Sequence, residues 1–260
     1  MDEMREFIED IVREAGERIR PLFGKERAQY QKSDSRSDVV TKADLLAEEI
    51  LISRIEERFP EHGIISEERG RLRAEAEHVW IMDPIDGTIN FATNVPLWGV
   101  MLAFTHNKKV QQAAIFMPVM NEFVYAQRGG GAFLNGERIT CSTTADIGAS
   151  IGCISSRSGM ALDFNRALFD FSEGKNILFS AFHSIAASAR YIASGERDWN
   201  ASFSGGLHDY AAPSLILEEA GCTVTDTDGN PWTTESKGLV AANPMLYPAL
   251  WSIVQKIPRG

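Results

Sequence analysis

Apolar residues near the N-terminus recur at steps of three and four, the spacing of one face of an α-helix. They predict an amphipathic helix that ends near residues 21–24 and is built on Met4, Ile8, Ile11, Ala15, Ile19 and Leu22. A second helix is predicted from about Thr41 to just before Pro60, because Thr41 and Asp44 have the spacing of a capping box. The polar stretch between the helices, residues 29–38, has no core-forming pattern and is predicted to be a mobile loop.

Beyond the second helix, short apolar runs predict strands. A buried strand is predicted at 79–82, and an antiparallel meander at 99–104, 112–117 and 122–126, while Asn135-Gly136 is a type I′ hairpin signal. After about Asp146 the pattern alternates, with strands at 150–154, 177–179, 223–225 and 239–241 and helices at 162–171, 184–193, 209–220 and 245–253. The chain is therefore predicted to have an N-terminal α+β half, residues 1–146, and a C-terminal α/β half, residues 147–260.

Charge and composition exclude several classes of partner. The 260 residues carry a formal net charge of −10, which repels nucleic acid and anionic membranes, so direct binding to either is not expected. The N-terminus lacks the basic and apolar regions of a secretory signal, and no apolar run approaches the roughly 20 residues of a membrane span. The three cysteines form no CxxC pair and indicate neither a zinc site nor a disulfide framework. These features predict a cytoplasmic protein with reduced thiols.

The segment with the most chemical content is Asp83-Pro84-Ile85-Asp86-Gly87-Thr88, which follows a buried strand directly. A carboxylate at a strand end costs desolvation energy unless it is paired or binds a cation. Two carboxylates three residues apart, with the carbonyl between them, can present oxygens to one Mg²⁺ ion. The structural alternative is an Asx-turn in which Asp86 caps the Gly87-Thr88 turn.

Two further acidic positions share this character. Glu67 and Glu68 follow the apolar run Ile64-Ile65, and Asp209 opens a predicted helix after Gly205-Gly206. Each has a structural alternative, a solvated strand end for the glutamates and an N-cap for Asp209. No single cap or turn accounts for all three clusters together. The run Gly129-Gly130-Gly131 is not a phosphate loop, because it lacks Lys-Ser/Thr and precedes a hairpin.

Taken together, these motifs resemble the signature motifs of the inositol monophosphatase family. The similar stretches extend over most of the chain, from about residue 32 to residue 243: Asp38-Val39-Val40-Thr41-Lys42-Ala43-Asp44, Gly63-Ile64-Ile65-Ser66-Glu67-Glu68, Asp83-Pro84-Ile85-Asp86-Gly87-Thr88, Gly131-Ala132-Phe133-Leu134-Asn135-Gly136, Asp209 and Glu219-Ala220-Gly221. The resemblance implies a layered αβαβα sandwich, a homodimer, and two or three Mg²⁺ ions per site. It implies hydrolysis of a small phosphorylated metabolite.

The resemblance also implies a role for each matching residue. The implied metal ligands are Glu67, Asp83, Asp86, Asp209 and the carbonyl of Ile85. Thr88 and Asp44 resemble the pair that orients or deprotonates the attacking water, with Glu67 as the next candidate for activating it. Gly87 and Thr88 resemble the backbone donors to the phosphate, and Lys32 and Ser33 fall in the loop that folds over the site. Such a site needs no nucleophilic side chain, because bound Mg²⁺ acidifies a water and neutralises the phosphate.

The substrate side departs from the family pattern. Ser188 lies where members carry a Gly-Ser/Thr-Ala-Ala run, and Ser202 stands about where they place an acid that binds sugar hydroxyls, with Asp198 the nearest carboxylate upstream. With Asp209, these two serines are the candidate substrate contacts of the C-terminal half. His183 replaces a usual arginine, and His208 replaces a usual tryptophan. Inositol phosphate is therefore not expected to be the best substrate.

Two alternatives stay open at this point. One is a sibling activity within the superfamily: a histidinol-phosphate, fructose-bisphosphate or adenosine-bisphosphate phosphatase. The segment Pro96-Leu97-Trp98-Gly99 resembles the first of these, although core packing is the favoured interpretation of Leu97 and Trp98. The other is a regulatory binding protein on this scaffold, since some relatives are linked to RNA metabolism. Retention of all four acidic metal positions favours an enzyme.

Overall fold

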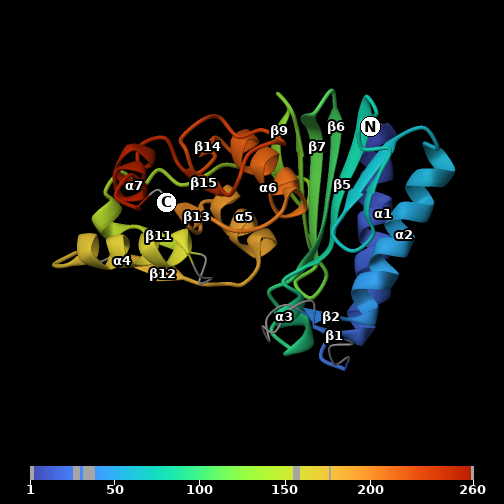
Figure 1. Cartoon of the computed structure of the whole chain (residues 1–260), viewed down its shortest axis with the longest axis horizontal. Coiled ribbons are helices and arrows are strands. Elements are labelled where there is room, and N and C mark those ends of the chain that lie inside the picture. The colour runs from blue at the N-terminus through green and yellow to red at the C-terminus, as the bar shows by residue number, and fades with distance from the viewer. Residues whose placement is uncertain (1–2, 26–29, 32–38, 155–158, 176, 259–260) are drawn as a thin grey trace.

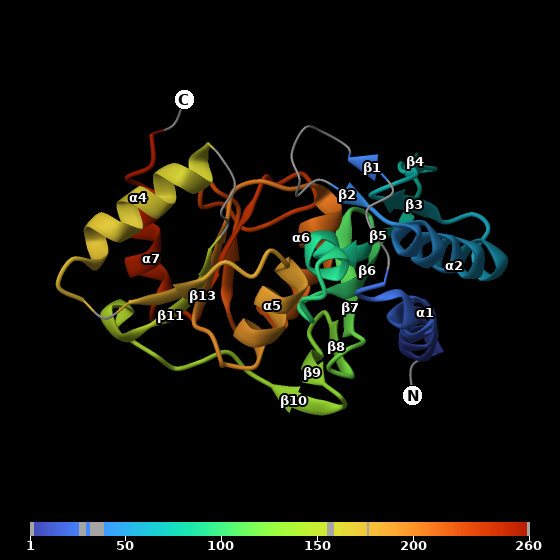
Figure 2. The same ribbon diagram turned by 90° about the horizontal axis from the view of Figure 1, so that it is seen from below.

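Helices and sheets alternate in layers along the long axis of the molecule (Figure 1). Helices α1 (Glu3–Ile19) and α2 (Lys42–Arg58) cover the outer face of a large sheet, and α5 (Ile185–Ala193) and α6 (Leu207–Glu219) lie between this sheet and a smaller one. Helices α4 (Met160–Ser172) and α7 (Tyr247–Val254) cover the far face of the smaller sheet. Figure 2 shows the same order from below. This arrangement confirms the predicted αβαβα sandwich. The computed structural model describes residues 3–25, 30–31, 39–154, 159–175 and 177–258.

The outer layer consists of the two helices that the apolar periodicity predicts, α1 (Glu3–Ile19) and α2 (Lys42–Arg58), with a 3-10 turn at Arg20–Leu22. The capping box is confirmed: the Thr41 hydroxyl accepts from the Ala43 N–H, and the Asp44 carboxylate accepts from the Thr41 N–H at 2.8 Å. Between the helices, two short strands, β1 (Tyr30–Gln31) and β2 (Val39–Val40), pair antiparallel where only a loop is predicted.

The large sheet has the strand order β10-β9-β8-β7-β6-β5-β3-β4, and β3 with β5 is its one parallel pair. Successive side chains of a strand point to opposite faces. On β5, Val79 and Ile81 accordingly face α5 and α6, while Trp80 and Met82 face α1 and α2. Its strands are β3 (Gly63–Ser66), β4 (Gly70–Leu72), β5 (His78–Asp86), β6 (Gly99–His106), β7 (Lys109–Met117), β8 (Glu122–Gln127), β9 (Gly131–Leu134) and β10 (Glu137–Ile139).

The smaller sheet has the order β12-β11-β13-β15-β14 and is parallel only from β12 to β13. Its strands are β11 (Ile151–Ile154), β12 (Leu178–Ser180), β13 (Trp199–Ser202), β14 (Thr223–Thr225) and β15 (Leu239–Ala242). The helices of this half are α4 (Met160–Ser172), α5 (Ile185–Ala193), α6 (Leu207–Glu219) and α7 (Tyr247–Val254), with a 3-10 turn at Ile147–Ala149. The strands and helices predicted here are present, with ends shifted by a few residues.

Local patterns predicted none of β1, β2, β4, β13 and helix α3 (Thr88–Ala92), and the last two have clear physical reasons. Strand β13 is buried on both faces, yet its Trp-Asn-Ala-Ser sequence has no alternation, and Asn200 is tolerated because its amide donates to the Leu239 carbonyl at 3.2 Å. Helix α3 (Thr88–Ala92) is a short segment that follows the left-handed Gly87. Both positions depend on tertiary contacts rather than on local periodicity.

The glycine run at the start of β9 binds a carboxylate of the protein itself and not an external anion. The carboxylate of Glu219, at the end of α6, accepts from the N–H groups of Gly129 and Gly131 at 2.7 and 2.8 Å. The run therefore ties α6 to the large sheet, as expected of a segment that is not a phosphate loop. The hairpin that follows has positive φ at both Asn135 and Gly136, as a type I′ turn requires.

Within the described part of the chain, no helix has the length and apolar character needed to cross a bilayer. The division at residue 146 stays a prediction.

Candidate active site

The end of β5 carries two carboxylates that face the same region. Asp83 and Asp86 are both buried, and the pairing of β5 with β6 is irregular between them. The Asx-turn of this segment belongs to Asp83, whose Oδ1 accepts from the Ile85 N–H at 3.1 Å, and not to Asp86 as the structural alternative supposed. The irregularity lets acids three residues apart face one region, which a regular strand would not allow.

Asp209 approaches this region from the middle helical layer. Helix α6 begins at Leu207 with Gly206 as its N-cap, two residues earlier than predicted, so Asp209 is the third helical residue and not the cap. Its carboxylate accepts from the Gly206 N–H. Asp83, Asp86 and Asp209 each place one carboxylate oxygen within 4.8 Å of the others, although the two aspartates of β5 come from another layer.

Burial and the proximity of these carboxylates raise the pKa values of Asp83 and Asp86. The pKa of Asp83 is raised well above its usual value, first by burial and then by the negative charges of Glu67, Asp86, Asp209 and Asp44. Burial raises the pKa of Asp86 to about 7, although hydrogen bonds from Ser184, Ala186 and Ile185 oppose the rise. Acids gathered this closely cannot all be ionised at neutral pH without a cation among them. The arrangement could hold a metal ion.

Asp86 also joins β5 to the start of α5, about a hundred residues later in the chain. Its carboxylate accepts from the Ser184 hydroxyl and from the N–H groups of Ile185 and Ala186, at 3.1 and 2.9 Å, at the start of α5. The Ser184 oxygen in turn caps α5 by accepting from the Ala187 N–H at 3.0 Å. Sequence reasoning missed Ser184. Its only signal was a serine at the start of a predicted helix, which gives no indication of a partner 98 residues earlier.

Glu67 follows β3, where a second missed residue holds the backbone. The buried Glu48 of α2 accepts from the Ser66 hydroxyl and from the N–H groups of Glu68 and Arg69 at 3.1 and 3.0 Å. Glu67 is half-buried between these anchored residues, near enough to Asp83 and Asp44 for its charge to raise the pKa of both. A signal for Glu48 was present in the sequence, an acid four residues after Asp44 on the buried face of the same helix.

Asp44 and Thr88 meet across 44 residues. One oxygen of Asp44 serves the capping box, accepting from the Thr41 N–H and hydroxyl, while the other lies 3.2 Å from the Thr88 hydroxyl. The same hydroxyl lies 2.9 Å from the carbonyl oxygen of Ile85. Burial raises the pKa of Asp44 to about 6. The helix cap and the contact with Thr88 are therefore not alternatives, because the carboxylate makes both.

Gly87 links β5 to α3 in a conformation that favours glycine. Its φ is 84°, and a Cβ added there would lie 2.8 Å from the carbonyl oxygen of Leu97. Thr88 is the first residue of α3, and the first N–H groups of a helix have no intrahelical acceptor. This local geometry is compatible with the predicted backbone donors to a phosphate, which stay a prediction.

The candidate substrate contacts are placed less directly. Ser188 is buried in α5, where its hydroxyl donates to the Ser184 carbonyl at 2.9 Å, and Ser202 is buried in β13, where its hydroxyl accepts from the Asn200 amide at 3.2 Å. Neither belongs to the acidic group. Asp198 does not replace the expected acid, since its carboxylate accepts from Ser142 and from the Ile151 N–H at 2.5 and 2.7 Å.

Of the replaced positions, His208 lies beside the site, with Nε2 3.4 Å from an Asp209 oxygen. His183 is exposed and precedes Ser184. Lys32 and Ser33, expected in the loop over the site, lie outside the described residues. The substrate roles of all these residues stay predictions.

Comparison with known proteins agrees with this geometry. The sequence profile of the inositol monophosphatase family matches residues 1–259. A Thermotoga maritima protein named fructose-1,6-bisphosphatase/inositol-1-monophosphatase is 31% identical over 87% of this chain and 86% of its own length. The Nus factor SuhB of Escherichia coli (strain K12) is 32% identical over 92% of this chain and 91% of its own. The structure of a Thermotoga maritima IMPase is similar with a TM-score of 0.88, 30% identity and 98% coverage of both chains. Family and enzyme names support a phosphatase acting on a small phosphorylated substrate. The chain belongs to the inositol monophosphatase family.

Proposed function

We propose that the protein is a Mg²⁺-dependent phosphomonoesterase that hydrolyses a sugar or polyol phosphate by attack of a metal-activated water. The observation that carries this proposal is the group of Asp83, Asp86 and Asp209, whose oxygens converge within 4.8 Å from two layers of the fold. Glu67 raises the pKa of Asp83 from one side of this group.

The donor atoms fit magnesium. The group offers carboxylate oxygens without a histidine or cysteine ligand, and the Ile85 carbonyl lies beside it at the strand end. Hard oxygen donors suit Mg²⁺, whereas imidazole and thiolate favour later transition metals. Glu67, Asp83, the Ile85 carbonyl, Asp86 and Asp209 are the proposed ligands. When bound, two or three Mg²⁺ ions would neutralise the phosphate dianion and acidify a water.

The remaining residues would position the reacting groups. A hydroxyl has one proton and two lone pairs. When Thr88 donates its proton to Asp44, 3.2 Å away, its oxygen is free to accept from a water and direct that water toward the phosphorus. The N–H groups of Gly87 and Thr88 would hold phosphate oxygens. Placement of this kind accounts for most of the protein's share in phosphoryl transfer.

The substrate is proposed to be a polyol or sugar phosphate other than myo-inositol 1-phosphate. Ser202, at the position of the expected acid, is buried and hydrogen-bonded to Asn200. The carboxylate of Asp198 already accepts from Ser142 and Ile151, so it is not available for sugar hydroxyls. A site that lacks a hydrogen-bonding group cannot use it to discriminate between substrates. The name of the Thermotoga maritima relative covers both fructose 1,6-bisphosphate and inositol 1-phosphate.

Phosphate release from a panel of inositol, fructose, histidinol and adenosine phosphates, with Mg²⁺ and with chelator, tests this proposal. We expect release that requires Mg²⁺, with inositol 1-phosphate not leading the panel. A lead for inositol 1-phosphate of tenfold or more in kcat/KM would contradict the substrate assignment. A homodimer belongs to the same proposal and is tested by light scattering.

A regulatory role is the second candidate, because the Escherichia coli relative is named a Nus factor. The net charge of −10 disfavours direct binding to nucleic acid, so such a role would act through a protein partner. A chain that releases no phosphate from any member of the panel at saturating Mg²⁺ would favour this candidate.

A further inference from the structure

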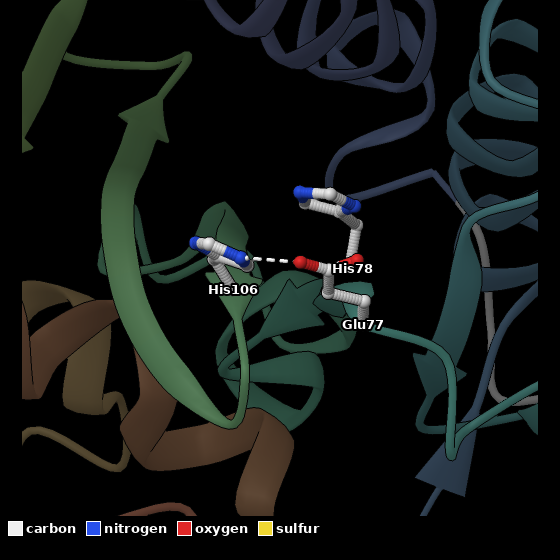
Figure 3. A group of neighbouring side chains, drawn as sticks. All are labelled: Glu77, His78 and His106. Atoms are coloured by element: carbon white, nitrogen blue, oxygen red, sulfur yellow. Dashed lines mark hydrogen bonds and ion pairs between the residues drawn. The ribbon is translucent and has the colours of Figure 1, made fainter.

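A second group of metal-ligating side chains lies at the other end of β5. His78 is the first residue of this strand and pairs directly with His106, the last residue of β6. Glu77 immediately precedes His78, and its Oε1 lies 2.8 Å from His106 Nε2. Figure 3 marks this contact with a dashed line and shows the His78 ring near it. Five residues separate His78 from Asp83, which at the rise of a strand is roughly 17 Å.

We propose that Glu77, His78 and His106 form a binding site for a transition-metal ion of the Zn²⁺ type. Two imidazoles and a carboxylate make a ligand set that such ions prefer and that Mg²⁺ does not. One ligand atom from each residue lies within 4.8 Å of the other two. The site is independent of the proposed function, since it shares no residue with the acidic group at the far end of the strand.

The three ligand atoms lie close enough together for a tetrahedral ion, but the rings must turn to direct their lone pairs at it. Ligand atoms about 2.0–2.1 Å from Zn²⁺ lie roughly 3.3 Å from one another. The pair from Glu77 and His106 must therefore open slightly from 2.8 Å, and His78 must turn toward them. These movements meet little resistance, because the side chains of His106 and Glu77 are 44% and 62% exposed. A fourth position would remain open to water.

A third histidine packs beside the site without being a ligand. Nδ1 of His62 accepts from the indole N–H of Trp80 at 3.0 Å, so the neutral ring of His62 carries its proton on Nε2 and offers no lone pair there. His62 stacks on one face of His78 with centroids 4.9 Å apart, and His106 stacks on the other face at 4.8 Å. The planes of His78 and His106 are only 13° apart, so the half-exposed His106 ring must tilt before the in-plane lone pairs of both rings can point at one ion.

A bound ion would link the loop residue Glu77 to the start of β5 and the end of β6. The backbone already joins this corner, because the Asn107 N–H donates to the Glu77 carbonyl at 2.8 Å. An ion that binds the folded chain and not the unfolded one raises the melting temperature, and a hundredfold excess over Kd is expected to raise it by roughly 5 °C or more for a chain of this size.

Titration calorimetry with Zn²⁺ on the full chain in saturating Mg²⁺ tests the proposal, with melting curves alongside. We expect one Zn²⁺ per chain, and at least a tenfold loss of affinity in each of Glu77→Gln, His78→Ala and His106→Ala. Glu75→Gln is the matched control, because it removes the same charge from the same exposed loop. His62→Gln keeps an acceptor for Trp80 and should bind Zn²⁺ within about threefold of the unchanged protein.

Circular dichroism of each variant separates loss of the site from loss of the fold. The proposal would be overturned if the unchanged chain bound no Zn²⁺ at a Zn²⁺ concentration of about 100 micromolar, which is on the order of the Kd of a weak surface site. Unchanged affinity in all three ligand variants would overturn it as well. The Zn²⁺ ligands would then be sought at the thiols of Cys141 and Cys222, which contact each other; a hydrogen bond with Cys222 lowers the pKa of Cys141.

Discussion

Replacing Asp44 by asparagine changes one oxygen into an NH₂ group and keeps the shape of the side chain. In the protein, the N–H and hydroxyl of Thr41 donate to one oxygen of Asp44 at 2.8 and 2.6 Å, and the Thr88 hydroxyl lies 3.2 Å from the other. The asparagine oxygen can serve Thr41 as before, while its NH₂ group faces Thr88 and cannot accept the Thr88 proton. The helix cap is retained and the proposed catalytic contact is lost.

The expected effects on stability and turnover have opposite signs. Burial raises the pKa of Asp44 from 3.8 to about 6, which corresponds to a cost of about 3 kcal/mol for keeping the carboxylate charged in the folded metal-free chain. Asparagine avoids most of this cost, so at pH 8 without metal the variant should be more stable by about 1–3 kcal/mol. At about 2–4 °C per kcal/mol, its melting temperature should rise by roughly 2–12 °C. Turnover should fall by a factor on the order of 10²–10⁴.

The assay is kcat at saturating Mg²⁺ for Asp44→Asn, Thr88→Ala and the double variant, with melting curves in chelator. Residues that act as a unit are strongly non-additive, so the double variant should lose little more than either single variant. If the two losses multiply, or if Asp44→Asn keeps kcat within threefold, the contact between Asp44 and Thr88 is not catalytic and the water is activated elsewhere. Glu67 would then be the next candidate.

Two other outcomes follow from the buried acids. Glu48→Ala removes the acceptor for Ser66, Glu68 and Arg69. It should therefore lower the unfolding free energy by about 2–4 kcal/mol and raise the Mg²⁺ concentration for half-maximal activity about tenfold. Glu48→Gln keeps an acceptor oxygen and should change both quantities little. In chelator, the melting temperature should fall as the pH rises from 5 to 8, because Asp86, with a pKa of about 7, keeps a proton that the unfolded chain releases. Saturating Mg²⁺ should reduce this fall, and a melting temperature that rises with pH in chelator would contradict the charge assignment.

Local patterns in the sequence predict most of the elements but fewer of the contacts. The capping box at Thr41 and Asp44, the buried strand that leads into Asp83 and the hairpin at Asn135 all follow from short-range spacing. All three are present, although the strand continues to Asp86 and does not end at Asp83. Strand β13 was missed because tertiary contacts satisfy Asn200, which on its own indicates a turn.

In the candidate site, too, the sequence indicates individual residues but not their contacts. The acids could be selected from sequence because each follows an apolar run or opens a helix, but their convergence depends on the layers. The bonds from Ser184 to Asp86 and from Ser66 to Glu48 join segments 98 and 18 residues apart, and no local pattern encodes them. The histidine group at the start of β5 was also invisible, because His78 and His106 become neighbours only through strand pairing.

The most direct test of the central claim is Mg²⁺-dependent phosphate release by chelator-treated protein, compared between the unchanged chain and Asp83→Asn. Asp83 is the most central acid of the site, since the charges of Glu67, Asp86, Asp209 and Asp44 all act on it. Release should be absent in chelator and restored by Mg²⁺ in the unchanged chain, while Asp83→Asn folds normally and loses at least about 10² in kcat. Full release in chelator, or an Asp83→Asn variant as active as the unchanged chain, would contradict a metal mechanism at this site.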